Sequence, residues 1–325
     1  MKAILCRGWG GPEDLSFEEV APPPVAPHQV RVRVRACGIN FADTLVIAGK
    51  YQVKPPFPFS PGIEIAGDIV ETGAEIGGLR PGQRVCAFLR ACGGYAEEVV
   101  ADAAATIPIP DAMDYVTAAA FPVAYGTSHL ALTHRGNLKS GETLLVLGAA
   151  GGVGLTAVEI GKALGARVIA AAGGPEKLAV AQAHGADALI DYSKESIRDR
   201  VRELTAGRGA DVVYDPVGGD AFDLALRAVN WEARMLVIGF AAGRIQSVPA
   251  NLILVKNISV VGVVWGAQGE RDPALVSRYL AELLRWWEDG KLKPLVSKTF
   301  PLGEAGAAMR ALLSRRYPGR IVLTT

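Results

Sequence analysis

The chain has 325 residues, of which 50% are hydrophobic and 21% are charged, and its formal net charge is +1. This length favours two domains of about 100–200 residues each, and the near-neutral charge gives no reason to expect nucleic acid or an anionic membrane as a partner. No apolar stretch reaches the ~18–20 residues that span a bilayer. The apolar run at the N-terminus is too short for a signal peptide, and the four cysteines are scattered. We therefore expect a cytoplasmic protein with reduced thiols.

The first third of the chain is typical of β structure. Residues 30–36, VRVRVRA, alternate valine and arginine, which is the pattern of a half-buried strand. Shorter apolar runs follow, separated by turns rich in glycine and proline such as LRPGQ. Many short strands joined by such turns predict a partly open β-barrel.

The character of the sequence changes near Asp111. A segment with a helical pattern, broken at Pro122, leads to a glycine-rich turn, and apolar strands then alternate with helices as far as Trp265. This alternation indicates a parallel sheet covered on both faces. The tail ends on a helix and the strand GRIVLTT, which we expect to return to the first domain. The expected division is 1–123 for the first part of the barrel domain, 124–265 for the α/β domain, and 266–325 for the return.

Residues 144–155, LLVLGAAGGVGL, run from an apolar strand through a glycine-rich turn into a helix. Aligned on its last glycine, the turn reads Ala149-x-Gly151-x-x-Gly154, with alanine at the usual first glycine. Gly151 permits close approach of a pyrophosphate, Gly154 lets the helix pack on its strand, and the amides at the helix start favour phosphates. The turn therefore predicts a dinucleotide site, with the pyrophosphate bound by Ala150, Gly151, Gly152 and Val153.

A site of this kind for NAD carries an Asp or Glu about 20 residues further on, where it holds the ribose hydroxyls. Here the neutral residues 171–174, AAGG, fill that place. A carboxylate would repel a 2′-phosphate, whereas small neutral residues leave room for one. We therefore predict NADPH as the cofactor, with candidate contacts to the 2′-phosphate region from Gly173, Lys177, Tyr192 and an arginine of SRRYPGR, Arg315. The alternative interpretation makes Lys177 an ordinary solvated lysine.

Five blocks of sequence together carry a family resemblance. They are ACGINFADTLVIAGKY, PFSPGIEIAGDIVETG, LRPGQRV, GAAGGVGLTAVEIGKALGARV and ADVVYDPVGG, and in this order they extend over essentially the whole chain. The chain resembles the medium-chain dehydrogenase/reductase superfamily and, within it, the zinc-free NADPH:quinone oxidoreductase (zeta-crystallin-like) branch. The resemblance implies a Rossmann doubly wound parallel sheet, a GroES-like β-barrel catalytic domain and a cleft between them. It also implies a homodimer, in which ISVVGVVW pairs across the two-fold axis.

The alcohol dehydrogenases of this superfamily bind zinc through a Cys in a GIC block and a His in a GHE block. This chain has Asn40 and Ile63 at those places and keeps only Glu64. The region of their structural zinc lobe holds Cys86 and Cys92, too few for a four-cysteine site. We therefore expect no metal. Without a Lewis acid, the expected acceptor is one whose conjugation already delocalises charge, a quinone or a small α,β-unsaturated carbonyl.

The resemblance also implies roles for individual residues. Asn40 and Tyr51 are the expected catalytic pair, stabilising an enolate or hydroquinone anion, and Leu45 replaces a second tyrosine that is frequent in the family. Asp43 is expected to hold local structure rather than to transfer protons. The nicotinamide is expected to meet Thr127, Gly239, Phe240 and Val263. Alternatively, Asn40 is a helix cap and Tyr51 a packing ring.

Other functions remain open from the sequence. An enoyl-CoA or enoyl-thioester reductase would show a basic entrance for the carrier phosphates. Arg31, Arg33 and Arg35 are the one obvious basic row, and a solvated strand face explains them better. A zinc alcohol dehydrogenase is disfavoured by Asn40 and Ile63. A non-enzymatic, crystallin-like NADPH-binding protein is the alternative from a different class.

Overall fold

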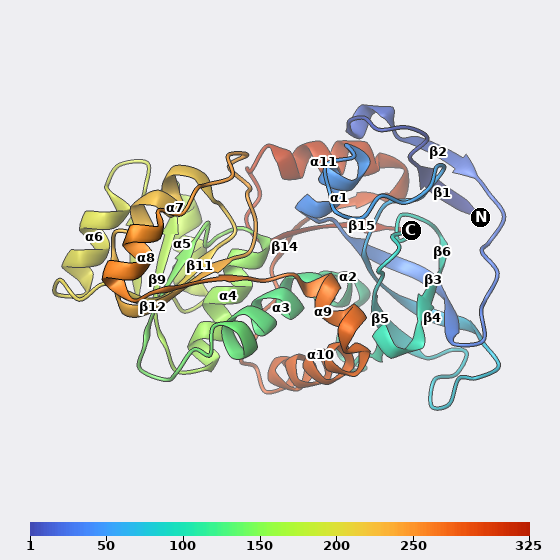
Figure 1. Ribbon diagram of the computed structural model, residues 1–325. Helices are drawn as coiled ribbons and strands as arrows, with labels where there is room; N and C mark the ends of the chain where they lie inside the picture. The colour runs from blue at the N-terminus through green and yellow to red at the C-terminus, as the bar shows by residue number, and fades with distance from the viewer. The chain divides into compact units, whose positions relative to one another are not determined.

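The computed structural model describes the backbone of residues 1–325 and every side chain except that of Pro273. The chain divides into two compact units. Unit 1 comprises Met1–Val123, Gly266–Glu288 and Pro294–Thr325, and unit 2 comprises Ala124–Trp265 and Asp289–Lys293 (Figure 1). The expectation that 266–325 forms one returning segment is wrong for Asp289–Lys293. This stretch groups with unit 2, where the Lys293 N–H donates to the Glu159 carboxylate at 3.2 Å.

Unit 1 is built on a seven-stranded sheet with the order β14-β15-β3-β4-β5-β7, in which β6 also pairs with β3. The strands are β3 (Gln29–Gly38), β4 (Glu64–Thr72), β5 (Arg84–Phe88), β6 (Glu98–Asp102), β7 (Thr106–Pro108), β14 (Val296–Pro301) and β15 (Arg320–Thr324). The valines of β3 are buried and its arginines face outward or partly outward, so the alternation in the sequence marks the core face.

The length of β3 allows the two ends of the chain to share one sheet. Its first half pairs with β6, whereas its last residues pair antiparallel with β15, in the register Val322↔Gly38 and Thr324↔Ala36. The C-terminal strand therefore completes the sheet of unit 1. Smaller elements of this unit are β1 (Lys2–Leu5), β2 (Ser16–Glu19), α1 (Phe41–Ile47), α2 (Tyr115–Ala119), α10 (Pro273–Glu288) and α11 (Ala305–Leu313).

Unit 2 contains a six-stranded sheet with the order β10-β9-β8-β11-β12-β13, and every pairing in it is parallel. The strands are β8 (Thr143–Leu147), β9 (Arg167–Ala172), β10 (Ala188–Asp191), β11 (Ala210–Asp215), β12 (Val229–Val237) and β13 (Ser259–Gly262). This order is that of the Rossmann fold, in which the chain reverses direction across the sheet between the first and fourth strands. The predicted fold class is confirmed.

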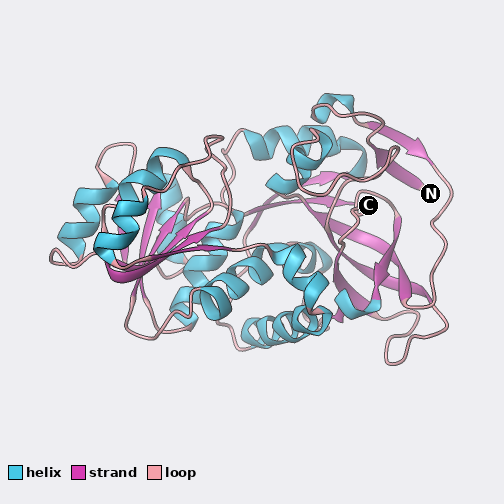
Figure 2. Cartoon of the chain, in the orientation of Figure 1, coloured by secondary structure: helices cyan, strands magenta, loops and turns pink.

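Helices join these strands and pack on the sheet (Figure 2). The connecting helices are α4 (Gly152–Ala163), α5 (Pro175–Ala183), α6 (Ile197–Leu204), α7 (Gly219–Ala225) and α8 (Ala250–Lys256), and α3 (Pro122–His129) with a π-helical segment at Leu130–Arg135 precedes β8. Pro122 begins α3, because the first turn of a helix tolerates a residue without an N–H. The sequence analysis did not identify α8 or α9 (Trp265–Arg271), whose short segments lack a clear helical period. Among the described residues, no helix is long and apolar enough to cross a bilayer.

Candidate functional site: a dinucleotide site in unit 2 and a buried polar cluster in unit 1

The glycine-rich turn connects β8 to α4 at the carboxyl edge of the sheet. Gly148, with a φ of 59°, makes the left-handed turn directly after the strand, so the tight turn falls one residue before the position that our alignment gave to Ala149. Gly151 is the N-cap of α4, and its N–H donates to the Gly148 carbonyl at 2.9 Å. The first-turn amides of α4 have no partners within the helix and carry the positive end of its dipole. They suit a pyrophosphate.

Gly154 is buried where α4 crosses the turn. A Cβ at this position would overlap the Gly148 carbonyl oxygen and lie 3.0 Å from the Ala149 Cα. Both obstacles are backbone atoms and have no rotamer through which to move away. Gly151, by contrast, is exposed, and a Cβ there would meet the Gly148 oxygen at 3.3 Å. The two glycines therefore act differently: Gly154 permits the helix to pack, and Gly151 leaves the turn open to a ligand.

The loops after β9 and β10 lie side by side at the same edge. The exposed ring of Tyr192 lies against Gly173, where a Cβ would come within 3.2 Å of the ring. Lys177 is on the first turn of α5 and is half-buried. Within unit 2 the structure thus brings together Gly173 and Tyr192 from the ends of β9 and β10, and Lys177 follows Gly173 on the first turn of α5.

An acid that the sequence analysis missed is present beside this region. The Asp191 carboxylate, at the end of β10, accepts hydrogen bonds from the Gly174 N–H at 3.0 Å and the Ser193 N–H at 3.1 Å. The Ser193 hydroxyl, the Gly174 amide and Lys194 lower the pKa of Asp191. This carboxylate is occupied in holding two loops together, unlike a ribose-binding acid at the end of β9, whose place is taken by neutral residues.

The loops after β11 and β12 are joined by backbone hydrogen bonds. The Ala241 N–H donates to the Pro216 carbonyl at 3.1 Å, and the Ala242 N–H donates to the Val217 carbonyl at 2.8 Å. Phe240 lies against Gly218, whose φ is 71°. Gly239 and Phe240 therefore lie in a pair of loops that are held together by hydrogen bonds. This would keep the two residues fixed in position against a nicotinamide ring.

Asp215 is the side chain that shapes this double loop. One carboxylate oxygen accepts the N–H groups of Val217 at 2.8 Å and Gly218 at 2.9 Å, and the residue is fully buried. Burial raises the pKa of Asp215 to about 6, and the two amide bonds oppose that rise. An Asp followed by a glycine-rich turn is an Asx-turn signal, which would have identified this residue in the sequence.

The other predicted cofactor contacts are distributed over both units. Thr127 is buried within α3, and Val263 is buried directly after β13, both in unit 2. Arg315 follows α11 in unit 1, with a φ of 56°. Its contact with a 2′-phosphate stays a prediction.

Asn40, at the start of α1, belongs to a buried network in unit 1. Its Nδ2 donates to Glu64 at 2.8 Å, and its Oδ1 accepts from the Arg320 guanidinium at 2.9 Å. A carboxylate only accepts and a guanidinium only donates, so the two partners fix the orientation of the amide. One N–H of Asn40 remains to be donated. Arg320 was missed because it lies 280 residues from Asn40 in the sequence.

Glu64 and Arg320 form a buried ion pair at the centre of this network. Arg320 also donates directly to Glu64, whose second oxygen accepts the Val123 N–H at 2.8 Å. Burial raises the pKa of Glu64, and the charge of Arg320 opposes that rise. The ion pair connects β4 with the C-terminal strand.

Asp43 and Tyr51 lie in the same unit, close to the network. Asp43 is buried in α1 and accepts from the Asn40 backbone N–H at 2.8 Å and the Tyr95 hydroxyl at 3.0 Å. Tyr51 is half-buried and packs against the hydrophobic core of unit 1. Burial, followed by the negative charge of Asp43, raises the pKa of Tyr51.

The described residues of unit 1 contain neither a cluster of metal-ligating side chains nor an arginine row without acidic partners. Among the described residues, no three His, Cys, Asp or Glu side chains gather as a metal site, and all four cysteines are buried free thiols. Arg31 pairs with Glu71, and Arg35 pairs with Asp68 at 2.8 Å. The positive charges of the row are thus neutralised by neighbouring strands.

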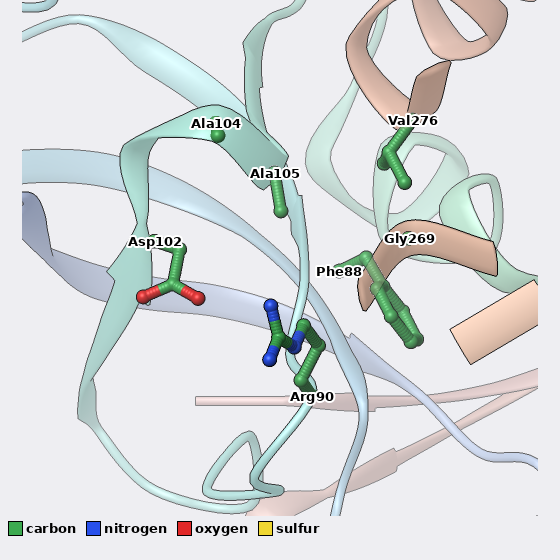
Figure 3. A pocket seen from close by; sticks show the side chains of 7 residues that line it. All are labelled: Phe88, Arg90, Asp102, Ala104, Ala105, Gly269 and Val276. Carbon is green, nitrogen blue, oxygen red and sulfur yellow. The ribbon is translucent and has the colours of Figure 1, made fainter. Parts of the chain in front are cut away.

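A small cavity of unit 1 is too narrow for a substrate. It measures about 20 Å³, which is room for about one water molecule. Figure 3 shows the residues that line it: Phe88, Arg90, Asp102, Ala104, Ala105, Gly269 and Val276. A wider groove of about 490 Å³ runs along β1 and β6 of the same unit and reaches Cys92.

The sequence matches two known domain families. Residues 26–111 match the family described as the alcohol dehydrogenase GroES-like domain, and residues 152–281 match the family described as zinc-binding dehydrogenase. The second description names zinc. In this chain, however, the two positions where the sequence analysis looked for zinc-binding Cys and His side chains are Asn40 and Ile63, whose amide and alkyl side chains are not zinc ligands.

Similar proteins extend over the full length of the chain. The quinone oxidoreductase-like protein 2 homolog of Nematostella vectensis is 41% identical, and the match covers 100% of this chain and 89% of that protein. The quinone oxidoreductase of Pseudomonas aeruginosa is 35% identical over 99% of each chain. The crystal structure of Escherichia coli quinone oxidoreductase complexed with NADPH is 30% identical, covers 100% of both chains and has a TM-score of 0.93. The chain therefore belongs to the medium-chain dehydrogenase/reductase superfamily, in its quinone oxidoreductase branch.

Proposed function

We propose that this protein is an NADPH-dependent oxidoreductase that reduces quinones or small α,β-unsaturated carbonyls without a metal ion. The observation that carries this proposal is the glycine turn at the start of α4, followed by the neutral end of β9 at residues 171–174. The similarity to quinone oxidoreductases, one of them complexed with NADPH, supports it.

The residues of unit 2 fit the cofactor. The open face at Gly151 and the amides of α4 suit the pyrophosphate, and the small neutral residues 171–174, next to Tyr192, leave room for a phosphorylated ribose. The double loop carrying Gly239 and Phe240 would hold the nicotinamide. When bound, NADPH supplies a hydride to a carbon atom of the acceptor.

Unit 1 supplies two hydrogen-bond donors that would stabilise the negative charge that develops on the acceptor. Asn40 has one N–H to donate, and its orientation is fixed by Glu64 and Arg320. Tyr51 has a phenolic O–H. Because a quinone or an enone delocalises the incoming negative charge, two such donors provide the stabilisation for which a simple ketone would need a metal ion.

The direct test follows the absorbance of NADPH with a panel of quinones, enones and acyl-CoA thioesters, using protein whose metal content has been measured. Oxidation with quinones or enones by metal-free protein is the expected result. Turnover confined to the thioesters would assign the enoyl-thioester activity instead, which the neutralised arginine row does not favour. Binding of NADPH without turnover on any acceptor would indicate the non-enzymatic, crystallin-like role.

Replacing Lys177 by alanine should weaken NADPH binding about tenfold or more and change NADH binding less than twofold. The reason is that NADPH alone carries the 2′-phosphate to which the ammonium group would bond. Dissociation constants for the two cofactors, measured by fluorescence titration, check this. Lys139→Ala is the matched control, because this exposed lysine precedes β8 at the opposite edge of the sheet. Equal losses for both cofactors would remove Lys177 from the phosphate site.

We also propose a homodimer that extends the sheet of unit 2. β13 is the end strand of that sheet, so one side of its backbone lacks a strand partner within the sheet. Several large apolar side chains of the unit are exposed, among them Leu254 at 78% and Val264 at 55%. A solution mass of about twice 34.1 kDa is expected by light scattering, and a monomeric mass at micromolar concentration would contradict the proposal.

A further inference from the structure

The loop that carries Tyr51 has few polar contacts. It comprises residues 48–59, which follow α1, and we call it the Tyr51 loop. Its beginning is tied to α1, where the Lys50 N–H donates to the Leu45 carbonyl at 2.8 Å. In the described part of the chain, residues 51–58 form no hydrogen bonds. The Tyr51 ring packs against the core of unit 1, but hydrogen bonds do not fix the backbone that carries it.

The segment after β1 is joined to both ends of the Tyr51 loop. The Cys6 N–H donates to the Phe59 carbonyl at 2.8 Å, and the Phe59 N–H donates to the Cys6 carbonyl at 3.1 Å. Four residues further on, the Gly10 N–H donates to the Ile47 carbonyl at 2.9 Å. Residues 6–10 therefore connect the last residue of the loop with the end of α1, directly before the first residue of the loop.

Trp9 lies in this segment, and its indole contacts the Tyr51 loop at two points. A Cβ at Gly49, whose φ is 67°, would lie 2.9 Å from the indole Cδ2, so the ring covers this backbone closely. The ring centroids of Trp9 and Phe57 are 4.4 Å apart in an edge-to-face arrangement, and Phe57 stacks at 5.7 Å on the buried ring of Phe59. One side chain thus holds the loop on either side of Tyr51.

The contact between Trp9 and Phe57 is not explained by the hydrophobic core. The exposed fractions of the two residues are 46% and 41%, and neither belongs to the core cluster of unit 1. Because both rings are about half in solvent, the principal effect of their contact is on the loop that they close. The loop has no hydrogen bonds at residues 51–58 to do this instead.

We propose that Trp9 is a positioning residue for Tyr51. This inference rests on the proposed function, in which the Tyr51 O–H stabilises the negative charge on the acceptor. The indole holds the loop at Gly49 and Phe57, so the Tyr51 hydroxyl is in place before the acceptor binds. Less backbone freedom is then lost on reaching the reactive geometry, which favours turnover. Trp9 acts through the loop and needs no contact with the acceptor.

The first test measures the loop in the absence of any substrate. Lys50 is exposed and supplies a trypsin site at its bond to Tyr51, whereas Lys54 precedes a proline and is not cut. Trp9→Ala should raise the rate of cleavage after Lys50 about tenfold or more, because the protease cuts the opened loop. Mass spectrometry of the fragments measures this rate. Cleavage after Lys139, an exposed loop residue of unit 2, is the internal control and should change less than twofold.

The second test measures turnover with a quinone or an enone. Trp9→Ala should lower kcat about fivefold or more and change the Kd of NADPH less than twofold, since the cofactor loops belong to unit 2. Trp9→Phe keeps an aromatic ring for the contact with Phe57, so it should retain at least half of the wild-type kcat. In a Tyr51→Phe background, Trp9→Ala should lower kcat less than twofold further, because both changes act through one hydroxyl.

Phe57→Ala tests the same contact from the other ring and does not depend on the folding of Trp9→Ala. It leaves the indole on Gly49 and releases the far end of the loop. Cleavage after Lys50 should therefore rise and kcat should fall, in the same direction as for Trp9→Ala.

Phe17→Ala is the matched control for the loss of an exposed aromatic ring. Phe17 is on β2 of the same unit and is 47% exposed. Its ring lies beside Gly303 and 5.9 Å from the Lys2 ammonium group. The variant should change neither the rate of cleavage after Lys50 nor kcat by more than twofold.

The outcomes distinguish this inference from the proposed function. Equal cleavage after Lys50 in the wild type, Trp9→Ala and Phe57→Ala would overturn the inference whether or not the protein is an enzyme. An undiminished effect of Trp9→Ala on kcat in the Tyr51→Phe background would also overturn it, because Trp9 would then act by another route. Failure of the wild type to oxidise NADPH with any acceptor contradicts the proposed function and the role in turnover, while the cleavage rates still decide whether Trp9 holds the loop.

Discussion

Gly154→Ala should destabilise the protein by about 3 kcal/mol and reduce NADPH affinity at least tenfold. The added Cβ would overlap the Gly148 carbonyl oxygen and crowd the Ala149 Cα, so the start of α4 must move away from the end of β8. That movement displaces the amides that would hold the pyrophosphate. Urea unfolding and fluorescence titration with NADPH measure the two effects.

Two other glycines provide the comparison for this result. Gly151→Ala should weaken NADPH binding while changing the free energy of unfolding by less than about 1 kcal/mol, because its Cβ would project from an exposed position. Gly77→Ala should change neither quantity, since a Cβ there meets no atom within 4 Å. If Gly154→Ala retained wild-type stability and affinity, the close packing of α4 on the turn would be refuted.

Arg320→Met should destabilise the protein by about 3–5 kcal/mol at pH 8, because it leaves the Glu64 carboxylate buried without its counter-charge. The variant should recover on acidification. Without Arg320 the folded-state pKa of Glu64 rises further above its unfolded value, so the folded protein binds the proton more tightly than the unfolded chain does. Stability is then greatest at low pH and is lost as pH rises through the folded-state pKa. Urea unfolding at pH 5 and pH 8 measures this difference.

The double variant Glu64→Gln/Arg320→Met is the control for the loss of charge. It removes both charges and keeps an amide oxygen that can accept from Asn40, so it should regain more than half of the lost stability. A double variant as unstable as Arg320→Met would mean that lost packing, rather than the unpaired Glu64 charge, causes the effect. Arg320→Met should also lower turnover through Asn40, whose amide loses the partner that fixes its orientation.

The polar cluster of unit 1 and the cofactor loops of unit 2 are organised by different means. In unit 2, backbone groups at the ends of parallel strands form the site, and side chains such as Asp191 and Asp215 brace the loops from behind. In unit 1, side chains from distant segments meet in the buried interior, where Glu64 is paired with Arg320. Substitutions in unit 2 should therefore act mainly on cofactor binding, and those in the cluster should act on stability and on the orientation of Asn40.

The sequence by itself determined the fold class and the location of the dinucleotide turn. Both depend on local patterns: the alternation of VRVRVRA, the apolar strands between helices, and a glycine turn that lies between one strand and one helix. The neutral residues after β9 could be identified in the same way, because they follow the turn at a fixed spacing.

The tertiary structure alone decided what Asn40 and Asp43 contact. Arg320 reaches Asn40 across 280 positions because β15 pairs with β3, and a pairing of this kind leaves no local signature. It also placed the Asp191 carboxylate beside Gly174, although Asp191 belongs to the next strand. The physical reason is that hydrogen bonds and buried charges depend on distance in space, whereas the patterns of a sequence report only on neighbours within a few turns of helix or strand.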